Sequence, residues 1–160
     1  MCNKQGKIVV GVLTICGILI YQLFSHKQQE LLDYKREKEK FKDYFQLLSH
    51  WLEVKSDGRS TVEYFKERGY DRIAIYGMGE LANRLWEELD GTKIDIVYGI
   101  DQDVCNTISR MDKIYSPDDV LEKVDAVIVT PFYAMDQIKN RLMAKVEFPI
   151  ISLEEVVWSL

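Results

Sequence analysis

Residues 72–101 read RIAIYGMGELANRLWEELDGTKIDIVYGID and set the fold class of this chain of 160 residues. The stretch opens with a short apolar run that ends at Tyr76 and closes with a second apolar run that ends at Asp101. Short apolar runs are typical of buried strands, and the spacing of Leu81, Leu85 and Leu89 is typical of one face of a helix. The stretch therefore predicts a strand, a helix and a second, parallel strand.

The turn between the first strand and the helix has the spacing GxGxxA, with Gly77, Gly79 and Ala82 at the small positions. This spacing is typical of nucleotide-binding βαβ units. Gly77 would permit the tight turn, Gly79 would let a phosphate approach the backbone, and Ala82 would let the helix lie close to the strand. The amino end of the helix would direct N–H groups and a positive dipole toward an anion.

Asp101 ends the second strand, where an acid in such units accepts hydrogen bonds from the ribose hydroxyls. No arginine follows closely to pair with a 2′-phosphate, so the pattern favours NAD over NADP. Ligands of parallel sheets lie at the carboxyl ends of the strands. The candidate cofactor-binding residues at these ends are Gly77, Met78, Gly79, Glu80, Leu81, Asp101, Gln102, Thr130 and Pro131.

Alternative interpretations of these residues stay open. The glycines could serve only strand-to-helix packing, Asp101 could simply end a strand, and Pro131 could set a loop in a fold without a ligand. Glu80 suits the helix dipole, but its charge would compete with a pyrophosphate unless the side chain points away.

Further strands and helices alternate after Asp101. Residues 113–115 predict a brief strand, and Ser116 with Pro117 predicts a helix start. A buried strand follows at residues 124–129, then a helix at 134–145, a strand at 149–152 and a last helix capped by Ser152. Before the first strand, Ser60 and Glu63 predict a capping box. The expected fold is α/β, a doubly wound parallel-sheet Rossmann-like domain over residues 59–160.

Residues 8–24, IVVGVLTICGILIYQLF, contain no charged side chain. The run predicts a transmembrane helix and a membrane anchor over residues 1–26. A cleaved signal peptide and a buried helix are the alternatives, although no AxA-like cleavage site follows the run. More cations follow the run than precede it, which predicts that the globular part faces the cytoplasm. The flanking cations are Lys4 and Lys7 on one side and Lys27, Lys35, Arg36, Lys38, Lys40 and Lys42 on the other.

Residues 27–58 predict a helical stalk. A set of mostly apolar residues, which begins just before the stalk, is spaced alternately by three and four, as in a coiled coil. The set is Phe24, Lys27, Leu31, Tyr34, Lys38, Phe41, Phe45, Leu48 and Leu52. One interpretation is a coiled coil that forms a parallel homodimer, and the aromatic end would then be a docking face. The other interpretation is that the helix packs onto its own domain through Phe41, Tyr44, Phe45, Leu48 and Trp51.

Evidence for catalysis is thin. His26 and His50 precede the domain, so no histidine within it can act as general base, and Cys105 is its single cysteine. Carboxylates such as Asp101, Asp103, Asp118 and Asp119 are present, but acids in polar loops are usually solvated. No metal-ligand spacing occurs. The net charge of −5 and the lack of a basic stripe argue against a nucleic-acid partner.

The segments at residues 73–89, 94–101, 124–131 and 149–156 carry a family resemblance. Over about residues 40–160 the chain resembles the small NAD(P)-binding-like Rossmann domains of bacterial surface-polysaccharide and glycosyltransferase gene clusters. It is also similar to the nucleotide-sugar-binding N-terminal domain of sialic-acid-type sugar O- and N-acyltransferases. The likeness implies that Gly77 and Gly79 contact phosphate and that Asp101 contacts ribose. These 160 residues contain no left-handed β-helix and no catalytic histidine, so it does not extend to acyl transfer.

The expected function is a membrane-anchored, cytoplasm-facing module that binds a nucleotide or nucleotide sugar, such as NAD or a uridine diphosphate sugar. It would have a non-catalytic, accessory role in cell-surface polysaccharide biosynthesis. One alternative is an NAD-dependent sugar-modifying enzyme, of oxidoreductase or epimerase type, completed by a partner chain. Another is a tether that recruits a glycosyltransferase or a polysaccharide-assembly protein.

Overall fold

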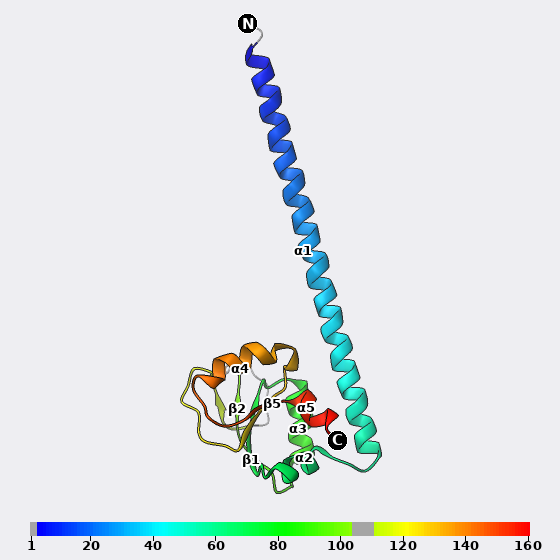
Figure 1. Ribbon diagram of the computed structural model, residues 1–160, viewed down its shortest axis with the longest axis vertical. Coiled ribbons are helices and arrows are strands. Elements are labelled where there is room, and N and C mark those ends of the chain that lie inside the picture. The colour runs from blue at the N-terminus through cyan, green and yellow to red at the C-terminus, as the bar shows by residue number, and fades with distance from the viewer. Residues whose placement is uncertain (1–2, 104–110) are drawn as a thin grey trace. The chain divides into compact units, whose positions relative to one another are not determined.

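The structure is a computed structural model that describes residues 3–103 and 111–160, with side chains from residue 17 onward in those ranges (Figure 1). It divides into two compact units, Met1–Tyr44 and Phe45–Leu160. A long helix, α1 (Asn3–Ser56), begins the chain. The elements that follow are α2 (Thr61–Arg68), β1 (Arg72–Tyr76), α3 (Glu80–Leu89), β2 (Asp95–Ile100), β3 (Ile114–Tyr115), β4 (Ala126–Val129), η1 (Phe132–Ala134), α4 (Met135–Met143), β5 (Ile150–Ser152) and α5 (Leu153–Trp158).

The strands form one five-stranded sheet in the order β3-β2-β1-β4-β5, and every pair is parallel. The predicted α/β class and the parallel sheet are therefore confirmed. The sheet fits a Rossmann-like fold, because the strand order reverses between β1 and β4 as in doubly wound sheets. The carboxyl ends of β1, β2 and β4 thus lie next to one another along one edge of the sheet.

Helices cover both faces of the sheet, with α4 on one face and α2, α3 and α5 on the other (Figure 1). Alternate residues of a strand point to opposite faces. Tyr76, Tyr98 and Val129 accordingly share a core with Ile138 and Leu142 of α4. On the other face, α3 buries Leu81, Ala82, Leu85 and Leu89, the face that the sequence predicted.

The carboxyl end of α1 belongs to the compact unit Phe45–Leu160, so this unit extends beyond the predicted domain of residues 59–160. Leu47, Trp51 and Val54 are buried there, each at most 3% exposed. Phe45 is 64% exposed and Leu48 is 38% exposed. The helix therefore packs onto its own domain, but through a different set of side chains from the one that the sequence suggested, with Trp51 the only buried residue common to both.

Two local predictions are wrong. Ser116 begins a turn and no helix, because the Asp119 carboxylate accepts the Ser116 N–H at 2.8 Å. Val120, which follows, is 92% exposed, so no apolar contact would hold a helix there. The capping box of Ser60 and Glu63 does not form either, since the Ser60 side chain makes no cap bond. Ser152 does cap α5, accepting the Glu155 N–H at 3.0 Å as predicted.

The predicted membrane anchor lies within α1, and residues 8–16 of its apolar run lie outside the residues whose side chains are described. Within the described part of the chain, no helix combines the length and the apolar character needed to cross a membrane. The long N-terminal helix is confirmed, whereas the transmembrane segment has no support from this finding.

Candidate functional site

The turn between β1 and α3 is held by Gly77. Its backbone has a φ of +85°, a conformation that side-chain-bearing residues rarely adopt. A Cβ at this position would lie 2.5 Å from Cδ of Pro131. The Gly77 N–H donates to the Ile100 carbonyl oxygen at 2.8 Å. Two observations therefore require glycine at position 77: the positive φ of the turn and the close packing of Pro131. The role of Gly77 is to shape the turn.

The end of β4 closes over this turn. Thr130 is 3% exposed, and its hydroxyl donates to the Gly77 carbonyl oxygen at 2.6 Å. The Thr130 N–H donates to the Tyr76 carbonyl oxygen at 3.0 Å. Gly77, Thr130 and Pro131, which the sequence placed in one site from the strand ends, are thus brought together. They contact one another at the carboxyl ends of β1 and β4.

Asp101 ties the end of β2 to the same turn. One carboxylate oxygen accepts the Met78 N–H at 2.7 Å, and the other accepts the Asp103 N–H at 2.9 Å. The Met78 side chain is buried and packs on Gly99, where a Cβ would lie 2.6 Å from the Met78 sulfur. Each oxygen of an ionised carboxylate has a second lone pair, so Asp101 keeps acceptor capacity. In the structure, the Asp101 carboxylate holds the turn between β1 and α3 in place.

The amino end of α3 is the open part of the site. Gly79 precedes the helix with extended backbone, φ −92° and ψ −163°, and no side chain caps the helix. A Cβ at Gly79 would meet no atom within 4 Å. The Glu80 side chain is 86% exposed and lies 3.7 Å from Arg84 one turn later, so it pairs along the helix surface. Leu81 is buried and Gln102 is exposed.

The acids that could serve catalysis have other partners. Arg141 approaches Asp118 to 2.7 Å and Lys145 approaches it to 3.2 Å, and their hydrogen bonds hold the pKa of Asp118 below its usual range. The Asp119 carboxylate accepts the Ser116 N–H. Among the residues described, no three His, Cys, Asp or Glu side chains are placed to hold a metal ion. Cys105 lies outside the described residues.

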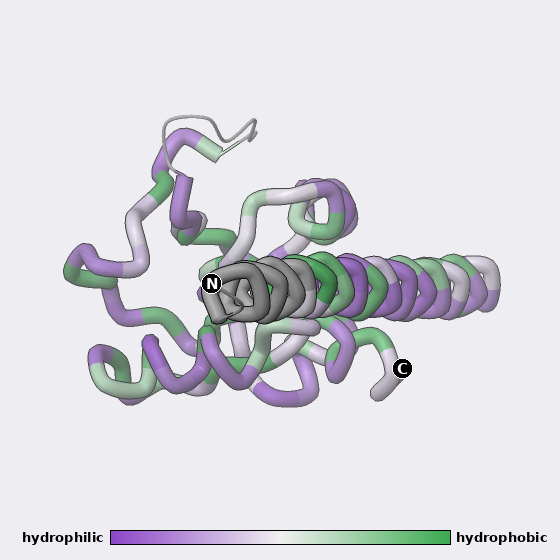
Figure 2. Tube along the Cα trace, turned by 90° about the horizontal axis from the view of Figure 1, so that it is seen from above, coloured by the Kyte–Doolittle hydropathy of each residue, from purple (hydrophilic) through white to green (hydrophobic). Residues whose placement is uncertain are grey.

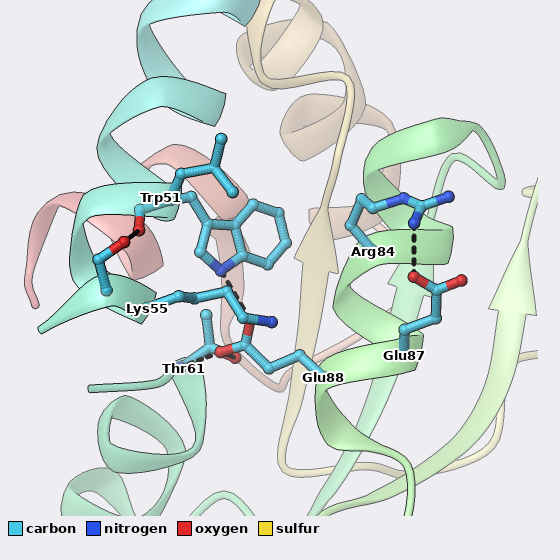
Figure 3. Close-up of polar contacts among 8 residues, drawn as sticks. Trp51, Lys55, Thr61, Arg84, Glu87 and Glu88 are labelled. Atoms are coloured by element: carbon cyan, nitrogen blue, oxygen red, sulfur yellow. Dashed lines mark hydrogen bonds and ion pairs between the residues drawn. The ribbon is translucent and has the colours of Figure 1, made fainter. Parts of the chain in front are cut away.

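Glu88 is the polar residue that sequence reasoning missed (Figure 3). Its side chain is 5% exposed, and it lies at the meeting of α1, α2 and α3. It accepts the Trp51 indole N–H at 2.8 Å and the Thr61 N–H at 2.6 Å, and Lys55 lies 3.2 Å away. A sequence signal existed, because Glu88 is seven residues after Leu81 and so falls on the buried face of α3.

The comparisons with known proteins are few. A family model described as C2185-like, N-terminal, matches residues 69–149, about half of the chain. The match covers β1, α3, β2, β3, β4 and α4, and with them all the candidate site residues. No curated protein and no solved structure matches the chain.

Proposed function

This chain belongs to the family described as C2185-like, N-terminal, and we propose that it is a binding module whose β1–α3 turn holds the phosphate of a nucleotide or nucleotide sugar. The observation that carries the proposal is the open, uncapped amino end of α3 beside Gly79. The amides of a helix's first turn have no partner within the helix, and the dipole favours an anion there.

Neighbouring side chains support this placement of the phosphate. Asp101 and Gly77 lock the turn in one conformation, so a ligand would not have to order it. Glu80 points away and pairs with Arg84, which removes the charge conflict that the sequence raised. The Met78 N–H already bonds Asp101 and Pro131 packs on Gly77, so the amides of Gly79, Glu80 and Leu81 would contact the phosphate.

The rest of the molecule would lie toward β2. The spare lone pairs of Asp101 can accept ribose hydroxyls, and the exposed Gln102 follows it at the same edge of the sheet. NAD and uridine diphosphate sugars both offer a diphosphate and a ribose with two hydroxyls. This shared chemistry is the ligand class that the site fits.

The proposed role is accessory, at a membrane, in cell-surface polysaccharide assembly. Support comes from the uncharged run of residues 8–24 and from the polysaccharide-cluster resemblance. Within the described side chains, Ile18, Leu19, Ile20, Leu23 and Phe24 are each more than half exposed on α1. Insertion of this helix in a bilayer would remove that apolar surface from water, and the cations that follow would keep the domain on the cytoplasmic side.

Ligand titration of the full chain tests the binding site. The purified chain in detergent is titrated by calorimetry with NAD, uridine diphosphate N-acetylglucosamine and coenzyme A. We expect one of these to bind, and Gly79→Val to weaken its binding at least about tenfold, because the branched side chain covers the amides. Unfolding stability should stay the same, since the space around Gly79 is open. As a control, Lys93→Val places the same valine side chain in an exposed loop before β2, and it should leave affinity unchanged.

The other outcomes separate the alternatives. Turnover of a bound nucleotide would favour the sugar-modifying enzyme. A chain that binds none of the three ligands would contradict the proposal and favour the tether.

Cell fractionation tests the location separately. The full chain should sediment with membranes through alkaline carbonate, and deletion of residues 8–24 should release it. A protease added to intact cells should not cut the domain. Cleavage by external protease, or a full chain that stays in the supernatant, would contradict the membrane part and leave the binding site untouched.

A further inference from the structure

The face of α1 that carries the alternate three-and-four spacing is uncovered. We call this face the seam and define it as Phe24, Lys27, Leu31, Tyr34, Lys38, Phe41, Phe45, Leu48 and Leu52. Phe41 is 76% exposed, Tyr34 66% and Leu52 65%. Apolar and polar residues recur along the described part of α1 in Figure 2. So many large, exposed apolar side chains on one face of a helix are typical of a surface that another helix covers.

The seam is distinct from the face of α1 that packs within the compact unit. Leu47, Trp51 and Val54 form that buried face, and Trp51 is bonded to Glu88. At 3.6 residues per turn, these three positions lie roughly a third of a turn from the seam. Phe45, Leu48 and Leu52 therefore remain available while α1 stays packed onto its domain.

The charges that flank the seam identify its occupant as a second copy of this chain. In a parallel, in-register pair of helices, a residue on one flank meets the residue five positions later in the partner. Here Glu30 would meet the partner's Lys35, and Glu37 would meet the partner's Lys42. Each contact occurs twice by symmetry. An antiparallel pair would place the two glutamate-bearing flanks together and the two lysine-bearing flanks together, so these opposite charges would not meet.

From this complementarity we propose that α1 forms a parallel, in-register coiled-coil homodimer along the seam. The two lysines of the seam are compatible with it. Lys27 donates to Glu30 of its own helix at 2.8 Å, so its charged end leaves the apolar interface. A single polar residue such as Lys38 at an interface position reduces stability and selects the register and the two-stranded state. The inference does not depend on ligand binding.

Disulfide cross-linking in the full chain tests whether the seam is the contact face. Cys2, Cys16 and Cys105 are replaced by serine, and one new cysteine is introduced by Phe41→Cys in the seam or by Asp43→Cys on the opposite side of the helix. Under mild oxidation in membranes, we expect Phe41→Cys to give at least about tenfold more covalent dimer than Asp43→Cys, because residue 41 lies in the seam and residue 43 lies on the opposite side of the helix. Equal yields, or no dimer at Phe41→Cys, would overturn the proposal.

Charge reversal tests the partner and controls for folding. One full chain carries Glu30→Lys and Glu37→Lys, and the other carries Lys35→Glu and Lys42→Glu. Each alone should have a dimer dissociation constant raised at least about tenfold, because like charges meet at four contacts. Their mixture should dimerise with near wild-type affinity, measured by analytical ultracentrifugation in detergent. Unaltered dimerisation of either variant alone, or a mixture that stays monomeric, would sink the assignment.

Discussion

At the level of single residues, Glu88 shows how one buried charge can organise several helices. Its carboxylate accepts the Thr61 N–H at the amino end of α2, where Ser60 makes no side-chain cap, and it also accepts the indole N–H of Trp51 in α1. Burying a carboxylate is costly, and here three donors and the nearby Lys55 offset that cost. The result is a polar contact that fixes where α1, α2 and α3 meet.

Glu88→Ala should lower the free energy of unfolding by about 3 kcal/mol, because it leaves the Trp51 and Thr61 donors buried without an acceptor. Urea denaturation of the full chain measures the change. Glu87→Ala is the matched control on the adjacent residue of α3 and should cost under about 1 kcal/mol, since it loses a pair with Arg84, whose side chain is 53% exposed. Equal losses would show that Glu88 has no special role.

Tyr98 links stability to pH. Burial, with Glu122 as the second cause, raises the pKa of Tyr98 from 10.0 to about 12. Its hydroxyl donates to the Glu122 carbonyl oxygen at 2.6 Å. Between pH 10.0 and about 12 the unfolded chain releases this proton while the folded chain keeps it. The contribution of Tyr98 is thus complete below pH 10 and is lost as the pH rises through this window.

Tyr98→Phe should be less stable than wild type at neutral pH by about 1 kcal/mol, because the hydrogen bond is lost. The difference should shrink from pH 10 to 12, since phenylalanine has no proton to release. Unfolding free energies measured across this range check the trend. Tyr133→Phe, at a side chain that is 49% exposed, is the control. A difference that grows with pH would contradict the assignment.

At the level of elements, two helices that begin with the same serine signal end up with different caps. Ser152 bonds the Glu155 N–H, and the Glu155 carboxylate accepts the Tyr64 hydroxyl at 3.1 Å. Ser60 makes no side-chain cap: the Glu63 N–H donates to the Ser60 carbonyl oxygen at 3.1 Å, and the neighbouring Thr61 N–H donates to Glu88 of α3. The local motif predicts neither of these two acceptors, and Glu88 comes from a distant part of the chain.

Ser152→Ala should therefore cost about 1 kcal/mol of stability, while Ser60→Ala should cost under about 0.5 kcal/mol. The two variants are the same chemical change at the start of two helices, so each is the control for the other. Thermal and urea unfolding followed by circular dichroism measure both. A Ser60→Ala loss as large as that of Ser152→Ala would show that the caps are equivalent.

At the level of the whole molecule, the folding unit includes the last part of α1. Leu47, Trp51 and Val54 are as buried as the core of the sheet. Full burial of a large apolar side chain contributes about 1.5–3 kcal/mol, so the three together match the net stability of an ordinary domain. The Phe45–Leu160 unit thus includes the buried part of α1 as well as the sheet and its helices.

A fragment of residues 59–160, the domain predicted from sequence, should be largely unfolded at 25 °C, whereas a fragment of residues 45–160 should unfold cooperatively. Far-ultraviolet circular dichroism and urea denaturation of the two fragments provide the comparison. A cooperative, equally stable 59–160 fragment would mean that α1 contributes little to the core.

Much of the architecture follows from the order of residues along the chain. The apolar runs before Gly77 and before Asp101, and the spacing of Leu81, Leu85 and Leu89, suffice for β1, α3 and β2, because strand and helix periods are local properties of a polypeptide. The seam of α1 is equally visible in the sequence. The candidate site could be located for a similar reason, since parallel strands place their carboxyl ends together.

Contacts between distant residues depend on the folded molecule. Three contacts are not visible in local patterns: Asp101 accepts the Met78 N–H, Pro131 packs on Gly77, and Glu88 accepts the Thr61 N–H. Burial also selects Leu47 and Val54 over Phe45 as the side of α1 that meets the domain. Local propensity is a short-range property, whereas a hydrogen bond or a buried contact forms only after the chain has brought both partners together.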